Sequence, residues 1–238
     1  MRIYGGLRPE DWTHWGQFTT LKTNAAGLLA RSGHARQIIY CSPLVDPYQP
    51  AERERPLMPA ILTAFLKRPP AILAIQTRGP LILRDLDLIC ALAAKTTVRV
   101  SFSVTTNRDE VRSRYEPHCE PNSERLHAVK ELRQAGIEVY ATLAPLLPCD
   151  PETLACAALD ASHRELIGDP LHVRATKAHG ATTREAARKV AARYHEERWF
   201  HPQFQAEVVS RIGQVARAAG FAFLTGPKGF GRLARHNH

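Results

Sequence analysis

Short apolar segments alternate with amphipathic helical segments along most of the chain, and this alternation constrains the fold more than any other feature. Strands are predicted over residues 37–43, 71–76, 98–106 and 139–143, and a weaker strand pattern lies near residues 171–175. Helical spacing of apolar residues links them. Because strands joined through helices pair in parallel with right-handed crossovers, the pattern predicts an α/β domain with a parallel sheet. It does not decide between an open sheet and a barrel.

The segment 98–106 is the clearest strand because its apolar and polar side chains alternate strictly. Its two predicted faces are Val98, Val100, Phe102 and Val104 on one side and Arg99, Ser101, Ser103 and Thr105 on the other. Strands inside an α/β core are commonly apolar on both faces. The hydroxyl face therefore needs polar partners. Either a ligand or water in a barrel mouth, or hydroxyl groups on a neighbouring strand, would supply them.

The sequence pattern changes near residue 180, from alternating strands and helices to helices alone. Thr182 and Glu185 form a capping-box pair that opens a charged helix, and a second helix is predicted over 203–219, ended by Gly220. The Gly-, Arg- and His-rich residues 226–238 are predicted to be loose. We therefore expect two regions, a main domain over 1–180 and a helical extension over 181–238. Trp12, Trp15 and Phe18 are expected to pack an N-terminal helix against the main domain.

Composition narrows the class of protein. The chain is 44% hydrophobic and 23% charged, which is typical of a soluble globular protein. It has no apolar run long enough for a membrane span and no visible signal peptide, so a cytoplasmic location with no membrane partner is expected. The net charge is +9, with the arginines scattered rather than clustered. That charge either aids solubility or attracts a polyanion such as nucleic acid.

The cysteine and histidine spacings predict no metal site. Cys41, Cys90, Cys119, Cys149 and Cys156 fit no zinc ribbon, CxxC pair or iron–sulfur run. The pair His195 and His201, with two glutamates between them, also lacks a recognised ligand spacing.

Polar segments follow the predicted strands, at the sheet edge where parallel β/α folds place their sites. The first is the proline-rich loop with Asp46, Gln49 and Glu52. If this loop is not part of a site, it is a surface turn whose acids cap a helix. The second contains Arg78, directly after a strand. The hydroxyl face of residues 98–106 is the third, and the segment 114–126 with Arg125 is the fourth.

Five segments in order carry a resemblance to a known family. They are TLKTNAAGLL (20–29), DPYQPAERERPL (46–57), ILAIQTRGPLILRDLDLI (72–89), VRVSFSVTT (98–106) and YEPHCEPNSERLHAVKELRQAGIEVYATLAPLLP (115–148). Over roughly residues 1–150 the chain resembles radical-SAM proteins of the spore-photoproduct-lyase-like, or DNA-photolyase-like, branch. The resemblance implies a partial parallel (β/α)6 TIM-like barrel that binds S-adenosylmethionine (SAM) and a [4Fe–4S] cluster. In that family the cluster reduces SAM, and a 5′-deoxyadenosyl radical abstracts hydrogen from the substrate.

The resemblance also implies roles for individual residues. The loop with Asp46, Gln49 and Glu52 would meet the amino-acid end of SAM. The hydroxyl face with Ser101, Ser103 and Thr105 would meet its ribose or carboxylate. Arg78 stands where the family often has a lysine near SAM, and arginine keeps the charge but changes the reach. Arg125 would help to close the barrel mouth.

One departure from the family bears on the chemistry. Members carry a CxxxCxxC motif before a segment like Gly5-Gly6-Leu7, and this sequence begins just after that point. The five cysteines here cannot replace three close thiolates on one loop. We therefore expect a barrel without its first strand and without reductive cleavage of SAM. Two alternatives stay open: a non-catalytic module that binds SAM or nucleic acid, and a metal-independent hydrolase using His163, His172 or His195.

Overall fold

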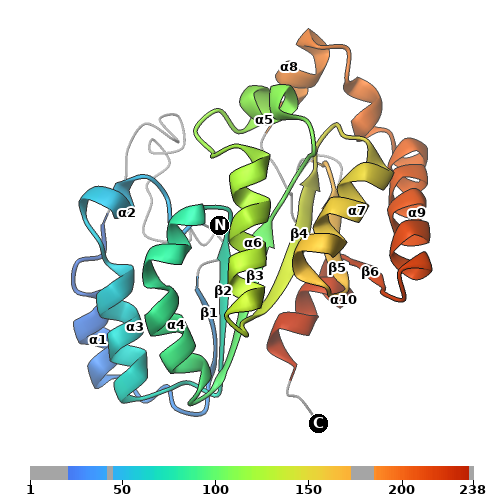
Figure 1. The fold of residues 1–238 in the computed structure, drawn as a ribbon. Coiled ribbons are helices and arrows are strands. Elements are labelled where there is room, and N and C mark those ends of the chain that lie inside the picture. Colours follow the sequence, from blue (N-terminus) through green and yellow to red (C-terminus); the bar gives the residue numbers. More distant parts are fainter. Residues whose placement is uncertain (1–20, 42–44, 173–184, 236–238) are drawn as a thin grey trace.

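A computed structural model describes residues 21–41, 45–172 and 185–235, and its centre is a parallel sheet (Figure 1). The six strands are β1 (Ile38–Cys41), β2 (Ile72–Thr77), β3 (Thr97–Ser103), β4 (Glu138–Leu146), β5 (Leu166–Pro170) and β6 (Phe223–Thr225). They lie in chain order, and each pairs in parallel with the next. The predicted α/β class with a parallel sheet is confirmed. Within the described residues β1 and β6 do not pair, so the sheet is open.

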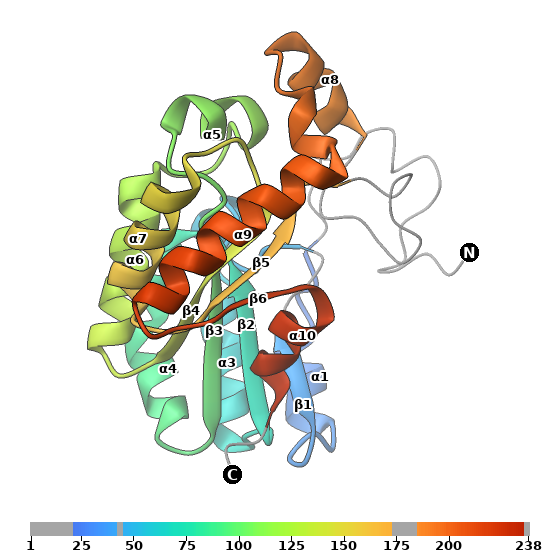
Figure 2. The ribbon, with the colours of Figure 1, turned by 90° about the vertical axis from the view of Figure 1, so that its right-hand side faces the viewer.

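Helices connect the strands and cover one face of the sheet (Figures 1 and 2). The α-helices are α1 (Ala25–Arg31), α2 (Ala51–Glu54), α3 (Met58–Lys67), α4 (Leu86–Ala93), α5 (Asp109–Tyr115), α6 (Asn122–Gln134), α7 (Pro151–Ser162), α8 (Ala186–Arg193), α9 (Pro202–Ala218) and α10 (Gly226–Phe230). The 3-10 helices of the described residues are η3 (Pro80–Asp85), η5 (Glu197–Phe200) and η6 (Gly231–Ala234). No described helix is long and apolar enough to cross a bilayer.

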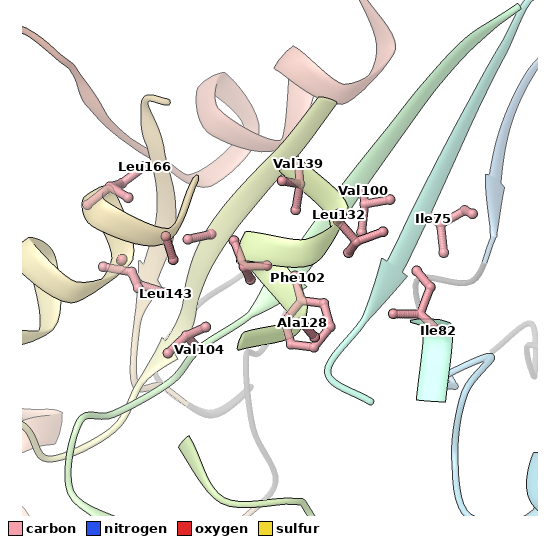
Figure 3. Close-up of a cluster of buried hydrophobic side chains, with 14 of the residues drawn as sticks. Ile75, Ile82, Val100, Phe102, Val104, Ala128, Leu132, Val139, Leu143 and Leu166 are labelled. Carbon is pink, nitrogen blue, oxygen red and sulfur yellow. The ribbon is translucent and has the colours of Figure 1, made fainter. Parts of the chain in front are cut away.

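The main core lies between the helices and what we call the apolar face of the sheet (Figure 3). On β3 this face carries Val98, Val100 and Phe102, the last two fully buried. Ala128 and Leu132 of α6 pack against it, as do residues of α3, α4, α7 and α9. The strict alternation along β3 thus places its apolar side chains under the helices, as predicted.

The opposite face, which we call the polar face, carries Arg99, Ser101 and Ser103 of β3 and Thr142 of β4, in register. Its lower part is covered by the C-terminal segment, because Leu233 and Phe230 pack against Ala74, Tyr140 and Ile167. Figure 2 shows α10 on the side of the sheet away from α6 and α7. The prediction that residues 226–238 are loose is wrong for 226–235, since these residues form α10 and η6 and bury Leu233 completely.

The last two strands differ from the prediction. Neither β5 nor β6 was predicted, and the weak strand predicted near 171–175 lies mostly outside the described residues. Gly168, Asp169 and Pro170 obscure the apolar pattern of β5, while the three residues of β6 are too few to show any alternation. Gly168 is needed where the strands meet, because a Cβ there would lie 2.5 Å from the Phe223 ring. The sheet therefore continues past the boundary predicted near residue 180.

The predicted helices of the C-terminal region are present as α8 and α9, and Gly220 ends the second at φ +80°. Gly136 ends α6 in the same way, at φ +81°. Other predicted features also fall outside the described residues. They are the helix with Trp12, Trp15 and Phe18, the capping residue Thr182, and the end of the first strand beyond Cys41.

Candidate functional site

Asp46 fastens its loop to the carboxyl end of β2. Its Oδ1 accepts hydrogen bonds from Tyr48 N at 2.9 Å and from Thr77 Oγ1 at 2.6 Å. Its Oδ2 accepts one from Arg78 N at 2.8 Å. Hydrogen bonds to an ionised carboxylate are stronger than neutral ones. The loop and the backbone of Arg78 are therefore held in one arrangement.

Glu116, which follows α5, joins three of the predicted site residues. Its Oε1 pairs with Arg78 Nη1, while Oε2 accepts hydrogen bonds from Thr105 Oγ1 and Arg125 Nη1, both at 2.8 Å. The Glu116 side chain is 6% exposed. Burial alone would raise the pKa of this carboxyl, but Arg125 and Arg78 outweigh it and hold the pKa below its usual range.

Arg125 ties this cluster to the end of β3. Its side chain is fully buried, and its Nε donates to the carbonyl oxygen of Ser103 at 3.0 Å. Arg78 differs because 36% of its side chain is exposed. We call Asp46, Arg78, Thr105, Glu116 and Arg125 the edge network. Its one half-open guanidinium, that of Arg78, is the group best placed to meet an anion.

The hydroxyl face divides between a structural bond and an accessible group. Ser101 Oγ and Thr142 Oγ1 lie 2.7 Å apart, and both side chains are buried. The partner of Ser101 is thus a hydroxyl of the neighbouring strand, one of the two possibilities that the sequence left open. Ser103 is half-buried and shares the polar face with half-buried Gln76 of β2. These two side chains are available to a ligand at the carboxyl edge of the sheet.

Glu52 and Gln49 lie in the same loop but outside the edge network. Glu52 is 5% exposed, and its two oxygens accept from Met58 N at 2.8 Å and from Leu57 N at 3.0 Å. Arg84 Nη2 adds an ion pair at 2.9 Å. This carboxylate caps α3, as the helix-capping alternative expects. Gln49 is half-buried, and its backbone carbonyl accepts from Glu52 N at 2.9 Å.

The cysteines do not fit an iron–sulfur cluster. They lie in β1, in α4, in the loop before α6, after β4 and in α7. Burial raises the pKa of both Cys41 and Cys149 to about 12, so these two thiols are protonated at neutral pH. Within the described residues, no three or more His, Cys, Asp or Glu side chains are arranged to hold a metal ion.

The three histidines of the hydrolase alternative come from separate elements. His163 follows α7 at φ 49° and His195 follows α8 at φ 56°. His172 follows β5, with Nδ1 2.8 Å from the Pro170 carbonyl and Nε2 3.8 Å from Asp169. In the described part of the chain, no hydrogen bond joins His163 or His195 to a Ser, Thr or Cys side chain.

Sequence reasoning missed Glu116 and Thr142 as members of the site. Glu116 follows a helix rather than a strand, so the rule that sites lie after strands does not reach it. The one feature of the sequence that points to Glu116 is its position as an acidic residue between Arg114 and Arg125, within the segment 114–126 already considered. Thr142 belongs to a strand whose other residues are mostly apolar.

Comparison with known proteins gives relatives whose own functions are undefined. No family model matches the chain. A protein of Methanocaldococcus jannaschii described as uncharacterized is 31% identical over 138 residues, which is 58% of this chain and 51% of the relative. An uncharacterized Mycobacterium tuberculosis protein is 33% identical over 132 residues, 54% of this chain and 38% of the relative.

A third relative is an uncharacterized protein of Acidianus two-tailed virus, 25% identical over 174 residues, or 67% of this chain and 56% of the relative. The chain therefore spans about half the length of the curated relatives it matches. No solved structure matches significantly.

Proposed function

We propose that this chain is the barrel body of a radical-SAM-type protein resembling the spore-photoproduct-lyase-like branch, and that it binds SAM at the carboxyl edge of its polar face. The proposal places it in the cytoplasm. Six parallel strands in unbroken chain order support a partial barrel, since this order is the one a β/α barrel has. The order of the family-like segments along the chain supports it further.

The observation that carries the proposal is the edge network. It brings the 46–57, 72–89, 98–106 and 115–148 segments together through Asp46, Arg78, Thr105, Glu116 and Arg125. These are four of the five segments on which the resemblance rests. Their convergence on one sheet edge supports a shared binding site.

Each residue then has a distinct part in binding. The half-open guanidinium of Arg78 would pair with the SAM carboxylate, and Ser103 and Gln76 would hydrogen-bond its polar groups. Asp46 acts indirectly, because its oxygens already accept three hydrogen bonds and hold Arg78 in place. Glu116 and Arg125 fix the direction of the Arg78 side chain.

The chemistry that a [4Fe–4S] cluster supplies to SAM in the family is its one-electron reduction. Since the described cysteines do not fit such a cluster, the proposed function includes no step that depends on it. We propose that these 238 residues alone bind SAM without cleaving it. Anaerobic reconstitution with iron and sulfide should then leave no visible cluster absorption, and a stable [4Fe–4S] spectrum would contradict this part of the proposal.

Calorimetry with SAM tests the binding site. The native chain should bind SAM, and Arg78→Met should weaken binding about tenfold or more, because it removes a charged hydrogen-bonding partner. Arg53→Ala is the matched control, since Arg53 is an exposed arginine paired with Glu120 on the surface. No saturable SAM binding by the native chain, or equal losses in the two variants, would refute the site.

The net charge of +9 favours a second candidate, a module that binds nucleic acid without chemistry. DNA binding that weakens steeply with rising salt, in a chain that does not bind SAM, would favour it over the first proposal. DNA binding of unchanged strength across salt concentrations would argue against phosphate contacts.

A further inference from the structure

A hollow of about 350 Å³ lies at the amino ends of β5 and β6, the sheet edge opposite the edge network. Its lining includes Glu165, Phe221, Leu224, Lys228, Arg232 and Arg235. In Figures 1 and 2 the same region, near α10, lies low in the molecule, while α5 and α8 lie at the top. The hollow is therefore separate from the proposed SAM site.

The hollow is electropositive. Three cations and one carboxylate line it, which leaves two positive charges. Arg232 is held by Glu165, with Nε at 2.8 Å from Oε1. Burial alone would raise the Glu165 pKa, but Arg232 holds it below its usual range, so the pair stays ionised. Lys228 and Arg235 are exposed, and in the described part of the chain no acidic side chain forms an ion pair with either.

The cations are presented by an anchored backbone. Buried Arg99 donates from Nη1 to the carbonyl oxygen of Arg235 at 2.5 Å and to those of Arg232 and Leu233 at 3.3 Å. Leu233 between them is fully buried on the polar face. A fixed backbone lowers the entropy lost when a ligand orders these side chains.

The wall beside the cations is apolar. Phe221 and Leu224 are half-buried, and both take part in lining the hollow. A volume near the lower end of the range for small-molecule pockets, a surplus of two positive charges and an aromatic wall specify a compact ligand. It should carry a dianion at one end and a flat ring at the other.

We propose that this hollow binds a nucleoside monophosphate. The phosphate meets Lys228, Arg232 and Arg235, and the base or sugar packs against Phe221 and Leu224. A phosphate near its second ionisation carries up to two negative charges at neutral pH, which match the surplus charge. Arg232 stays paired with Glu165, so Lys228 and Arg235 supply most of the attraction.

Calorimetry with uridine monophosphate on the full chain tests the proposal, because this probe lacks the adenine of SAM. The native chain should bind it saturably, and binding should weaken with salt. Lys228→Ala with Arg235→Ala should weaken it about tenfold or more. Lys189→Ala with Arg193→Ala is the charge-matched control on α8, and it should bind like the native chain. Circular dichroism of each variant checks folding.

Two fragments of the nucleotide test the assignment further. Uridine, without the phosphate, and inorganic phosphate, without the ring, should each bind about tenfold or more weaker than the nucleotide. No saturable binding, equal losses in the two double variants, or equal affinity for the nucleotide and inorganic phosphate would overturn the proposal.

The proposal for this hollow and the proposal for the SAM site can be tested independently. SAM should not displace uridine monophosphate, and Arg78→Met should leave nucleotide binding intact. Displacement by SAM would place the nucleotide at the other edge and overturn the assignment to this hollow.

Discussion

The two faces of the sheet are built from the same strands but have opposite chemistry. On β3, Val100 and Phe102 are fully buried beneath helices, while Arg99 and Ser101 are equally buried but engage polar partners. Burial alone therefore does not separate the faces. The apolar face gains stability from area removed from water. The polar face depends on every buried group having a partner, and its half-exposed edge carries the proposed binding site.

The comparison predicts the largest effect on the apolar face. Phe102→Ala leaves a cavity in the centre of the core and should lower the free energy of unfolding by about 4 kcal/mol. Urea denaturation measures this. A loss as small as that of a surface substitution would mean that the helices do not pack on β3 as described.

Glu116→Gln should have the next largest effect, because it leaves the fully buried Arg125 without its counter-ion. Removing one partner of a buried pair costs about 3 kcal/mol. Glu120→Gln is the matched control, since Glu120 pairs with exposed Arg53 and should cost at most about 0.5 kcal/mol. Equal losses in these two variants would show that the edge network adds no stability.

The same glutamate predicts a pH dependence. Its pKa is lower in the folded chain than in the unfolded chain, so its ionisation stabilises the fold above the ordinary glutamate pKa, about 4.3. That stabilisation is lost as the pH falls from this value through the lowered folded pKa. The stability difference between native and Glu116→Gln chains should therefore shrink on acidification, and a constant difference would contradict it.

Arg99→Met should have an intermediate effect of about 2 kcal/mol, because it removes hydrogen bonds to three backbone carbonyls of the C-terminal segment. Limited proteolysis should then cut within residues 226–235 before the rest of the domain. Resistance of that segment equal to the native chain would mean that its other contacts, the packing of Leu233 and Phe230 and the Arg232–Glu165 ion pair, are enough to anchor it.

Ser101→Ala should have the smallest effect, about 1 kcal/mol, because Thr142 loses its hydroxyl partner. Ser103→Ala, on the same face but half-exposed, should change stability by less than about 0.5 kcal/mol. For SAM binding the order should be reversed. Ser103→Ala should weaken the affinity more than Ser101→Ala, because only Ser103 is open to a ligand. Thermal denaturation and calorimetry together measure both.

The alternation of side chains in residues 98–106 was enough to predict both faces of β3, and the alternation of strands with helices along the chain was enough to predict the parallel α/β class. Periodicity fails where an element is too short or interrupted, as with β6 and with Gly168 in β5. It also cannot say which partner a buried polar group has. Ser101 turned out to bond a hydroxyl on β4, and Glu52 caps α3, because tertiary contacts far along the chain decide both. The ion pair of Glu116 with Arg78 joins residues far apart in the chain, so the sequence alone does not show it.

The chain-order arrangement of the strands has a consequence for folding. Among the described strands, each pairs only with its neighbours in chain order, so the sheet can grow one strand at a time as the chain leaves the ribosome. The link between Arg99 and Arg235 spans 136 residues and can form only after Arg235 has been synthesised. Until then Arg99 lacks those carbonyl partners, so this part of the polar face is completed later than the pairing of the first strands.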